Sequence, residues 1–322
     1  MSELRKHLAD QADVSMRGLS RNDLCKVLHI QRRLDEQLVP LSYNGRNSCY
    51  LDSAMVALFH RKSKFLSRYV INAQNLDPQF NTAHEEVKRV INKIQRVFLD
   101  KKVDVPMTCE NLRRHFAGPL FKAFSRSHEI EWQQSQIDPV YVPKVLEFMY
   151  QIPRSVLYTD LTRSSRRPKR IHGELDSWMF TIEAFRKKQS FKDIFPVRVD
   201  DATGSTSKII KSSFMYIPVI RAQQAGINEN GIVKEKSFDP VIPTEYIQLS
   251  GQTRRLELVS ILIHSGDEHG GHYTALLKLK DGPWVYYDDM AHKVQFAGVS
   301  LDQALRLNRG FPKKNSAAFV YM

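Results

Sequence analysis

Cys49 lies where an irregular turn, Asn44-Gly45-Arg46-Asn47-Ser48, leads into a run of residues with helical spacing. Backbone N–H groups at the start of a helix favour negative charge, so this position favours a thiolate, the nucleophilic form of cysteine. The amide of Asn44 could face the oxyanion that forms when a carbonyl is attacked. Because most cysteines only fill space in a core, we assign Cys25 and Cys109 to that role. The pattern predicts a nucleophile at Cys49, with a buried structural cysteine as the alternative.

A second group of reactive side chains lies in His264-Ser265-Gly266-Asp267-Glu268-His269-Gly270-Gly271-His272-Tyr273, between two expected strands. The two adjacent glycines would let another strand or a thin extended substrate approach the backbone beside His272. A cysteine nucleophile needs a nearby histidine, whose ring must be oriented by a carboxylate or amide. Asp288 and Asp289 end the next expected strand, and the first lies 16 positions (288 − 272) beyond His272. A hairpin of this length can bring them together.

The same side chains allow two other interpretations. His264, His269 and His272 could hold a metal ion with Asp288 or Asp289. However, loop histidines at these offsets do not match the helical His-x-x-x-His arrangement of common zinc hydrolases. A histidine in a strand and two acids at its end are also common as purely structural features. We expect neither a metal nor another cofactor.

Composition narrows the class of protein. The chain has 322 residues, with 48 Lys and Arg against 35 Asp and Glu, a formal net charge of +13. Its three cysteines form no Cys-x-x-Cys pair, which excludes a disulfide framework and a four-cysteine zinc site within this chain. No apolar run approaches the roughly 18 residues of a membrane span, and the polar N-terminus lacks the features of a signal peptide. We expect an intracellular protein in the cytoplasm, with the nucleus left open.

Part of the basic excess lies in Arg163-Ser164-Ser165-Arg166-Arg167-Pro168-Lys169-Arg170, where five of eight residues are basic. Such a run occurs in nuclear-import and nucleic-acid-binding segments, but more often it is a solvated loop, which we favour. The net charge also leaves nucleic acid or an acidic protein open as a partner. No recognisable nucleic-acid-binding motif accompanies it.

The elements that must position these residues change character along the chain. The first half has apolar residues at helical spacing after Cys49, over 87–98 and over 142–150. The second half is rich in β-branched and aromatic residues, which predict strands over 214–220, 256–264, 273–280, 284–288 and 318–322. Asp281-Gly282 indicates a hairpin between two of these strands. Helices followed by antiparallel strands predict an α+β protein with a helical lobe and a sheet lobe.

Taken together, these segments resemble the ubiquitin-specific protease family of deubiquitinating enzymes. The cysteine box of that family reads approximately Gly-Leu-x-Asn-x-Gly-Asn-Thr-Cys-Tyr-Met-Asn-Ser, and residues 41–53 are similar to it. Its histidine box is matched in order by His264-Ser265-Gly266, Gly271-His272-Tyr273, Trp284 and Asp288-Asp289. A finer likeness, in Asn47-Ser48-Cys49-Tyr50-Leu51-Asp52-Ser53 and Asp288-Asp289-Met290-Ala291, is to the cylindromatosis-type branch.

The resemblance implies a papain-like, hand-shaped fold of thumb, palm and fingers. Residues 1–38 would be a charged helical extension, and 39–322 a single catalytic domain with the thumb at about 41–155 and the fingers and palm at 156–322. By position, Cys49 is the implied nucleophile and His272 the general base. The other implied roles are orientation of His272 by Asp288, oxyanion or triad support by Asp289, oxyanion binding by Asn44, and a substrate-tail channel bordered by Gly270, Gly271 and Tyr273.

The implied activity is hydrolysis of the isopeptide or peptide bond after the C-terminal glycine of ubiquitin. The implied partners are ubiquitin, polyubiquitin and ubiquitinated proteins, with no membrane. Two departures keep alternatives open. Arg46 stands where the family has a glycine, and the three cysteines cannot supply the four zinc ligands found in the fingers of many members. The alternatives are a protease for another ubiquitin-like modifier and a catalytically weak ubiquitin-binding module.

Overall fold

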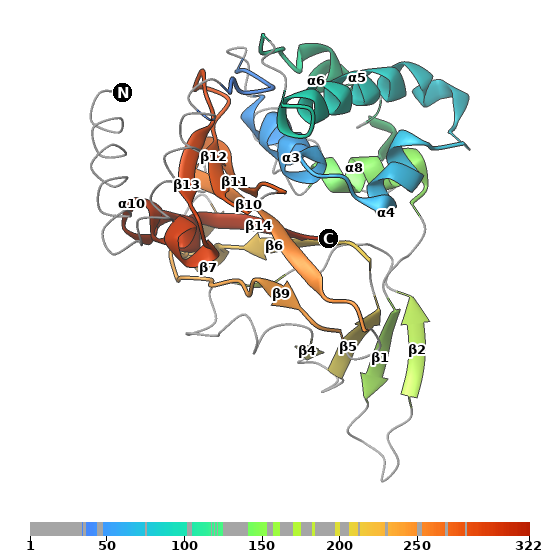
Figure 1. Ribbon diagram of the computed structural model, residues 1–322. Coiled ribbons are helices and arrows are strands. Elements are labelled where there is room, and N and C mark those ends of the chain that lie inside the picture. The colour runs from blue at the N-terminus through green and yellow to red at the C-terminus, as the bar shows by residue number, and fades with distance from the viewer. Residues whose placement is uncertain are drawn as a thin grey trace.

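All the described helices but the last, Leu301–Asn315, gather at one end of the molecule, the main sheet lies in the middle, and a smaller sheet extends from the opposite end (Figure 1). The computed structural model describes residues 34, 37–43, 48–74, 76–101, 105–116, 118, 120, 122–124, 141–152, 157–161, 170–174, 182–183, 197–199, 206–211, 213–228, 231–249, 253–267, 270–280 and 282–322. Within these ranges, no helix combines the length and the apolar character needed to cross a membrane.

Two helices define the core of the helical end. The helices and helical turns are α3 (Cys49–Phe59), α4 (Lys64–Leu66), η1 (Ser67–Ile71), η2 (Pro78–Phe80), α5 (Asn81–Phe98), α6 (Glu110–Phe116), α8 (Tyr141–Tyr150) and α10 (Leu301–Asn315). Every residue of α3 is buried, as expected of a helix enclosed on all sides. α5 is amphipathic and buries one stripe that includes Val87, Ile91 and Ile94. The three helices predicted from apolar spacing are confirmed.

The main sheet has eight strands, seven of them in the order β13-β12-β11-β10-β14-β6-β3, with β9 paired to β10. Its strands are β3 (Ile182–Glu183), β6 (Met215–Ile220), β9 (Tyr246–Ile247), β10 (Leu256–Gly266), β11 (Gly271–Lys278), β12 (Trp284–Tyr287), β13 (Gln295–Gly298) and β14 (Ser316–Tyr321). Five of these match the predicted strands within a few residues. Helices together with an antiparallel sheet confirm the predicted α+β class.

A second sheet, ordered β2-β1-β5-β4, and a β7-β8 hairpin complete the described strands. Their bounds are β1 (Leu157–Leu161), β2 (Arg170–Glu174), β4 (Val197–Val199), β5 (Thr206–Lys211), β7 (Ala222–Asn228) and β8 (Gly231–Lys236). Arg170, the last residue of the basic run, begins β2 and pairs with Leu161 of β1. The rest of that run lies outside the described residues, so its prediction as a solvated loop stays a prediction.

The main sheet carries a hydrophobic core on each face. Alternation along β11 sends Ala275 and Leu277 to the core shared with the helical end, and Leu276 to the opposite core. The opposite core also contains Trp284 and Leu305, the latter from α10. Helices therefore cover both faces of the sheet.

Three polar side chains tie α3 to β10 and β11. The Ser53 hydroxyl donates to the carbonyl of Tyr273 at 2.8 Å, and the Ser260 hydroxyl donates to that of Ala57 at 2.7 Å. Just after α3, the His60 ring lies 3.2 Å from the carbonyl of Lys278. Burial lowers the pKa of His60 to about 4, so its ring is neutral. These contacts fix the helix that begins at Cys49 against the strand that begins beside His272.

One sequence expectation at the start of the chain is wrong. We expect helical structure through residue 38, yet Leu38 already forms a β-bridge with Lys293. The Val39 N–H donates to the carbonyl of His292, and the carbonyl of Gln37 accepts from Val294. Pairing with a segment more than 250 residues away therefore replaces helix at this point. The proposed division at 38/39 stays a prediction.

Arg221 is a buried arginine at the junction of β6 and β7. Its side chain is 6% exposed, and burial lowers its pKa to about 10. The guanidinium donates to the carbonyls of Ser316, Ser237, Asp239 and Lys313 and to the hydroxyl of Ser316, at 2.7–3.2 Å. One side chain thus joins the segment after β8 to the end of α10 and the start of β14.

Replacing this arginine should destabilise the fold. In Arg221→Met, four carbonyls lose a charged donor in a buried place, so we expect the free energy of unfolding to fall by about 3 kcal/mol. Urea denaturation followed by circular dichroism measures it. Arg306→Met is the matched control because Arg306 pairs with Asp302 on the surface, where ion pairs contribute little. Equal stability of the two variants would contradict the prediction.

Candidate active site

Cys49 is the first residue of α3, and Ser48 is the N-cap. The hydroxyl of Ser48 makes no capping hydrogen bond, although its carbonyl accepts from the N–H groups of Leu51 and Asp52. Backbone N–H groups of a first turn have no partner within their own helix, and they carry a partial positive charge. Cys49 is 7% exposed at this position, so its sulfur lies at a nearly enclosed helix start.

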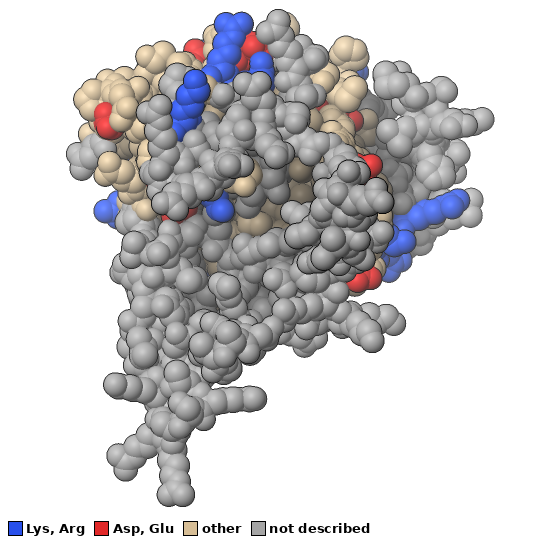
Figure 2. Space-filling model, turned by 180° about the vertical axis from the view of Figure 1, so that it is seen from behind, with Lys and Arg blue, Asp and Glu red and all other residues tan. Residues whose placement is uncertain are grey.

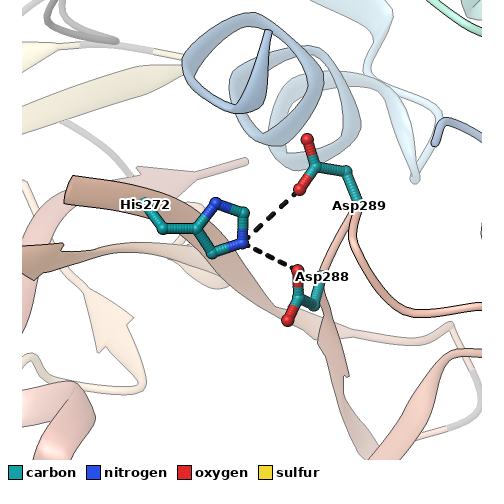
Figure 3. Close-up of side chains that lie close together, drawn as sticks. All are labelled: His272, Asp288 and Asp289. Carbon is teal, nitrogen blue, oxygen red and sulfur yellow. Dashed lines mark hydrogen bonds and ion pairs between the residues drawn. The ribbon is translucent and has the colours of Figure 1, made fainter. Parts of the chain in front are cut away.

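His272 and Asp288 are brought together by the β11–β12 hairpin. These strands pair antiparallel, with Ala275 opposite Tyr287, which places the end of β12 beside the start of β11. His272 Nε2 lies 2.8 Å from Asp288 Oδ1, a hydrogen bond between half-buried groups (Figure 3). The same oxygen accepts from the N–H of Met290 at 3.0 Å, which holds the carboxylate in place. The spacing argument for this pair is confirmed as geometry.

Asp289 approaches the same ring nitrogen from the side of the helix. Its Oδ1 lies 3.5 Å from His272 Nε2, and its side chain is fully buried, whereas that of Asp288 is 18% exposed (Figure 3). Its carbonyl accepts from the N–H of Tyr43 at 2.8 Å. Asp288 is therefore the direct hydrogen-bond partner of the ring, and Asp289 is a buried carboxyl group behind it.

The Cys49 thiol is a third neighbour of the His272 ring, beside the two carboxyl groups. Burial disfavours the charged imidazolium, but hydrogen bonds with Asp288 and with the Cys49 thiol outweigh it and raise the pKa of His272 to about 10. Because both carboxylates face Nε2, Nδ1 is the nitrogen left for the thiol. A cysteine, a histidine and a carboxylate from a helix start, a strand start and a strand end thus meet at one place. This arrangement can support nucleophilic catalysis.

Asp52, one turn after Cys49 on α3, is a charged residue that the sequence did not single out for chemistry. It is completely buried beside Asp289. Burial raises the pKa of each of these two carboxyls, and the nearby Asp52 further raises that of Asp289. A local signal existed, because Asp52 lies in the segment that resembles the cysteine box. Its meeting with Asp289 depends on long-range packing.

The glycines of the histidine segment lie where the β10–β11 ladder ends. Gly271 pairs with Gly266, and the Gly270 N–H donates to the Asp267 carboxylate at 3.1 Å. A Cβ on Gly271 would lie 2.3 Å from the Ser265 oxygen and 2.5 Å from His264 Nε2. The ring of Tyr273 stacks on that of His264, 4.4 Å between centroids. Gly271 thus allows a close approach that no other residue would permit.

A methyl group at Gly271 should impair the site. In Gly271→Ala the end of the ladder must shift beside His272, so we expect the catalytic efficiency toward the substrate that the sequence resemblance implies, a ubiquitin conjugate, to fall about 10- to 100-fold. Hydrolysis of ubiquitin-aminomethylcoumarin measures it. Gly282→Ala is the control, because Gly282 has φ +112° but no atom within 4 Å of the added methyl. That variant should be strained without losing activity, and equal activity losses in the two would contradict this reading.

Not all predicted residues can be placed. Asn44, Arg46 and His269 lie outside the described residues, as does Cys25. Cys109 is fully buried and free, in keeping with its structural assignment.

The described residues include one group whose geometry could suit a metal ion. In the described part of the chain, one group of metal-ligand type comes together, with atoms of His272, Asp288 and Asp289 within 4.8 Å of one another. His264 is not in it. Since the ring nitrogen of this group already hydrogen-bonds to Asp288, that bond explains the approach without an ion.

The basic residues that the structure describes are scattered or paired locally. On the face in Figure 2, the Lys and Arg side chains that are described lie in small separate groups among Asp and Glu. Several basic residues pair locally, such as Arg113 and Arg114 with Glu110. The geometry of the candidate active site therefore needs no contribution from the net charge.

Comparisons with known proteins relate this chain to ubiquitin carboxyl-terminal hydrolases in sequence and in fold. Residues 186–318 match the family model described as ubiquitin carboxyl-terminal hydrolase. The chain is 22% identical over 282 residues to ubiquitin carboxyl-terminal hydrolase 7 of Drosophila melanogaster, an alignment covering 76% of this chain and 23% of that protein. It is 67% identical over 33 residues to ubiquitin carboxyl-terminal hydrolase 5 of Schizosaccharomyces pombe, covering 10% of this chain and 3% of that protein. The chain thus spans less than a quarter of these relatives.

A solved structure extends the likeness to most of the chain. It is a SAGA DUB module of Ubp8, Sgf11, Sus1 and Sgf73 bound to monoubiquitin, with a TM-score of 0.59 and 13% sequence identity. The match covers 90% of this chain and 70% of that chain. At this identity the likeness concerns the fold. The finer likeness to the cylindromatosis-type branch is not confirmed by these matches.

Proposed function

We propose that this chain is a member of the ubiquitin-specific protease family and a cysteine-type deubiquitinase acting through Cys49, His272 and Asp288. The observation that carries the proposal is the hydrogen bond between His272 and Asp288 beside the Cys49 thiol. The substrate would be the isopeptide or peptide bond after the C-terminal glycine of ubiquitin, in polyubiquitin or ubiquitinated proteins.

In the proposed acylation step, the Cys49 sulfur attacks the carbonyl carbon of that glycine. His272, whose raised pKa favours the imidazolium, holds the thiol proton at Nδ1, while Asp288 holds the opposite nitrogen and stabilises this charge. The resulting tetrahedral oxyanion would be met by first-turn N–H groups of α3 and by the amide of Asn44. Donors of this kind contribute about 3–4 kcal/mol to such steps.

In the second half of the reaction, the C–N bond breaks and His272 gives its proton to the departing amine. A water molecule then attacks the thioester as His272 accepts its proton, which releases the ubiquitin carboxylate and regenerates the thiol. Gly270, Gly271 and Tyr273 would border the channel for the Gly-Gly tail. The two adjacent glycines, which carry no side chains, support this placement, because an extended peptide needs room beside the backbone.

The decisive experiment is reaction with ubiquitin that carries an electrophile in place of its C-terminal carboxylate. We expect one covalent adduct, and peptide mass spectrometry should locate it on Cys49. The absence of an adduct would overturn the proposal, as would an adduct on another residue. Parallel probes built on other ubiquitin-like modifiers separate the remaining enzymatic alternative, since preferential labelling by one of them would reassign the substrate. Binding of ubiquitin without labelling would indicate a non-catalytic binding module.

A further inference from the structure

Asp52 and Asp289 form a buried pair of carboxyl groups behind the candidate active site. Asp52 is 0% exposed and Asp289 is 2% exposed. Neither oxygen of Asp52 and neither oxygen of Asp289 receives a hydrogen bond of normal geometry. The nearest donors are few: the Ser48 hydroxyl and the Cys109 thiol lie beside Asp52, and His272 Nε2 lies 3.5 Å from Asp289 Oδ1. Two buried carboxylates with so few donors would be costly if both were ionised, so the arrangement favours a proton held between them.

The neighbours of the pair supply little positive charge. From the helical side, Cys49 and Tyr50 of α3 and Cys109 before α6 face the pair. From the sheet side come His272, Asp288, Tyr286 and Tyr287. His272 is the one cation among these described groups, and it already bonds to Asp288. A second uncompensated negative charge would therefore lie in an apolar, acidic environment.

We propose that Asp52 and Asp289 share one proton in the folded enzyme, and that Asp52 is a positioning residue acting through Asp289. The carboxyl of one group would donate its O–H to the carboxylate of the other, which satisfies an oxygen on each side. Two adjacent carboxyls that share a proton are known from other catalytic sites. The shared proton would link α3, which carries Cys49, to the turn that carries Asp288.

A consequence follows for pH. The pKa of Asp289 is raised from 3.8 to about 8, chiefly by burial and by Asp52. Because the folded pair keeps its proton to higher pH than an unfolded chain does, its contribution to stability is complete below about pH 4 and is lost as the pH rises through about 8. Near pH 6.5, unfolding should therefore release a proton that the pair had held.

Proton release on unfolding tests the pair directly. We expect wild-type protein unfolded in weakly buffered urea at pH 6.5 to release about one proton more than Asp52→Asn or Asp289→Asn. In each variant an amide N–H₂ replaces the shared proton as donor. Ser260→Ala is the matched control, because it removes a buried hydrogen bond of α3 elsewhere and should release as many protons as wild type. Equal release from wild type and Asp52→Asn would overturn the proposal, as would persistence of the extra proton in Asp289→Asn.

Activity tests the positioning role, which rests on the proposed function. We expect Asp52→Ala to lose about 10- to 100-fold in catalytic efficiency, and Asp52→Asn to restore most of it. The wild-type efficiency should decline above pH 8, whereas that of Asp52→Asn should not. An active Asp52→Ala, or the same alkaline decline in Asp52→Asn, would overturn the role. The proton count needs no turnover, so a failed ubiquitin probe would leave it standing.

Discussion

Replacing Cys49 by alanine should abolish hydrolysis of ubiquitin-aminomethylcoumarin, with a loss of about 10⁴-fold or more. The reason is that this variant lacks the proposed nucleophile. The sulfur lies at a nearly enclosed helix start beside His272, whereas a methyl group there has no nucleophilic electrons. Steady-state kinetics measures the loss, and calorimetric titration with ubiquitin should show that binding persists.

Cys109→Ala provides the matched control for this variant. Cys109 is equally a free and buried cysteine, but it lies before α6, where its thiol neighbours Asp52. We expect Cys109→Ala to retain activity within about tenfold and to react with the ubiquitin probe. Comparable losses in the two variants would show that the thiol at position 49 has no special role.

Asp288→Asn should lower kcat by about 10² to 10⁴-fold, the second largest effect that we expect. The 2.8 Å hydrogen bond from His272 Nε2 would then meet an amide, which can present the ring with a donor and so favour the wrong tautomer. The loss of a negative charge also removes stabilisation from the imidazolium. The ubiquitin Kd should change little because Asp288 holds the ring and not the substrate.

The variant Asp289→Asn distinguishes the role of Asp289 from that of Asp288. The Asp289 carboxylate is 3.5 Å from the same nitrogen, so we expect a smaller loss, about tenfold. A larger effect at 289 than at 288 would mean that Asp289 orients His272, and would reverse the two assignments.

Much of the fold was predictable where the pattern is local. Continuous β-branched and aromatic runs marked β10, β11 and β12, and Asp281-Gly282 marked the hairpin between the last two. The small sheet was not located strand by strand, because short polar strands such as β5 carry no clear alternation. Leu38 was misassigned because its bridge to Lys293 depends on a partner far along the chain.

In the candidate active site too, local contacts were predictable from the sequence and long-range contacts were not. The pairing of His272 with Asp288 was predictable because a hairpin brings residues at that spacing together. The meeting of Asp52 with Asp289 was not, because an aspartate in the first helical turn is usually solvated and gives no sign of burial. The hydrogen bonds of Arg221 could not be predicted either, since four of its acceptors are backbone carbonyls, which every residue has.

The central position of β14 has a consequence for synthesis of the protein. This strand lies between β10 and β6, so the sheet stays split until residues 316–321 have left the ribosome. Until then the edges of β10 and β6 that pair with β14 remain open, and α3 packs against an incomplete sheet. Final assembly would therefore be late and slow, and nascent chains paused before this point would be natural clients for chaperones.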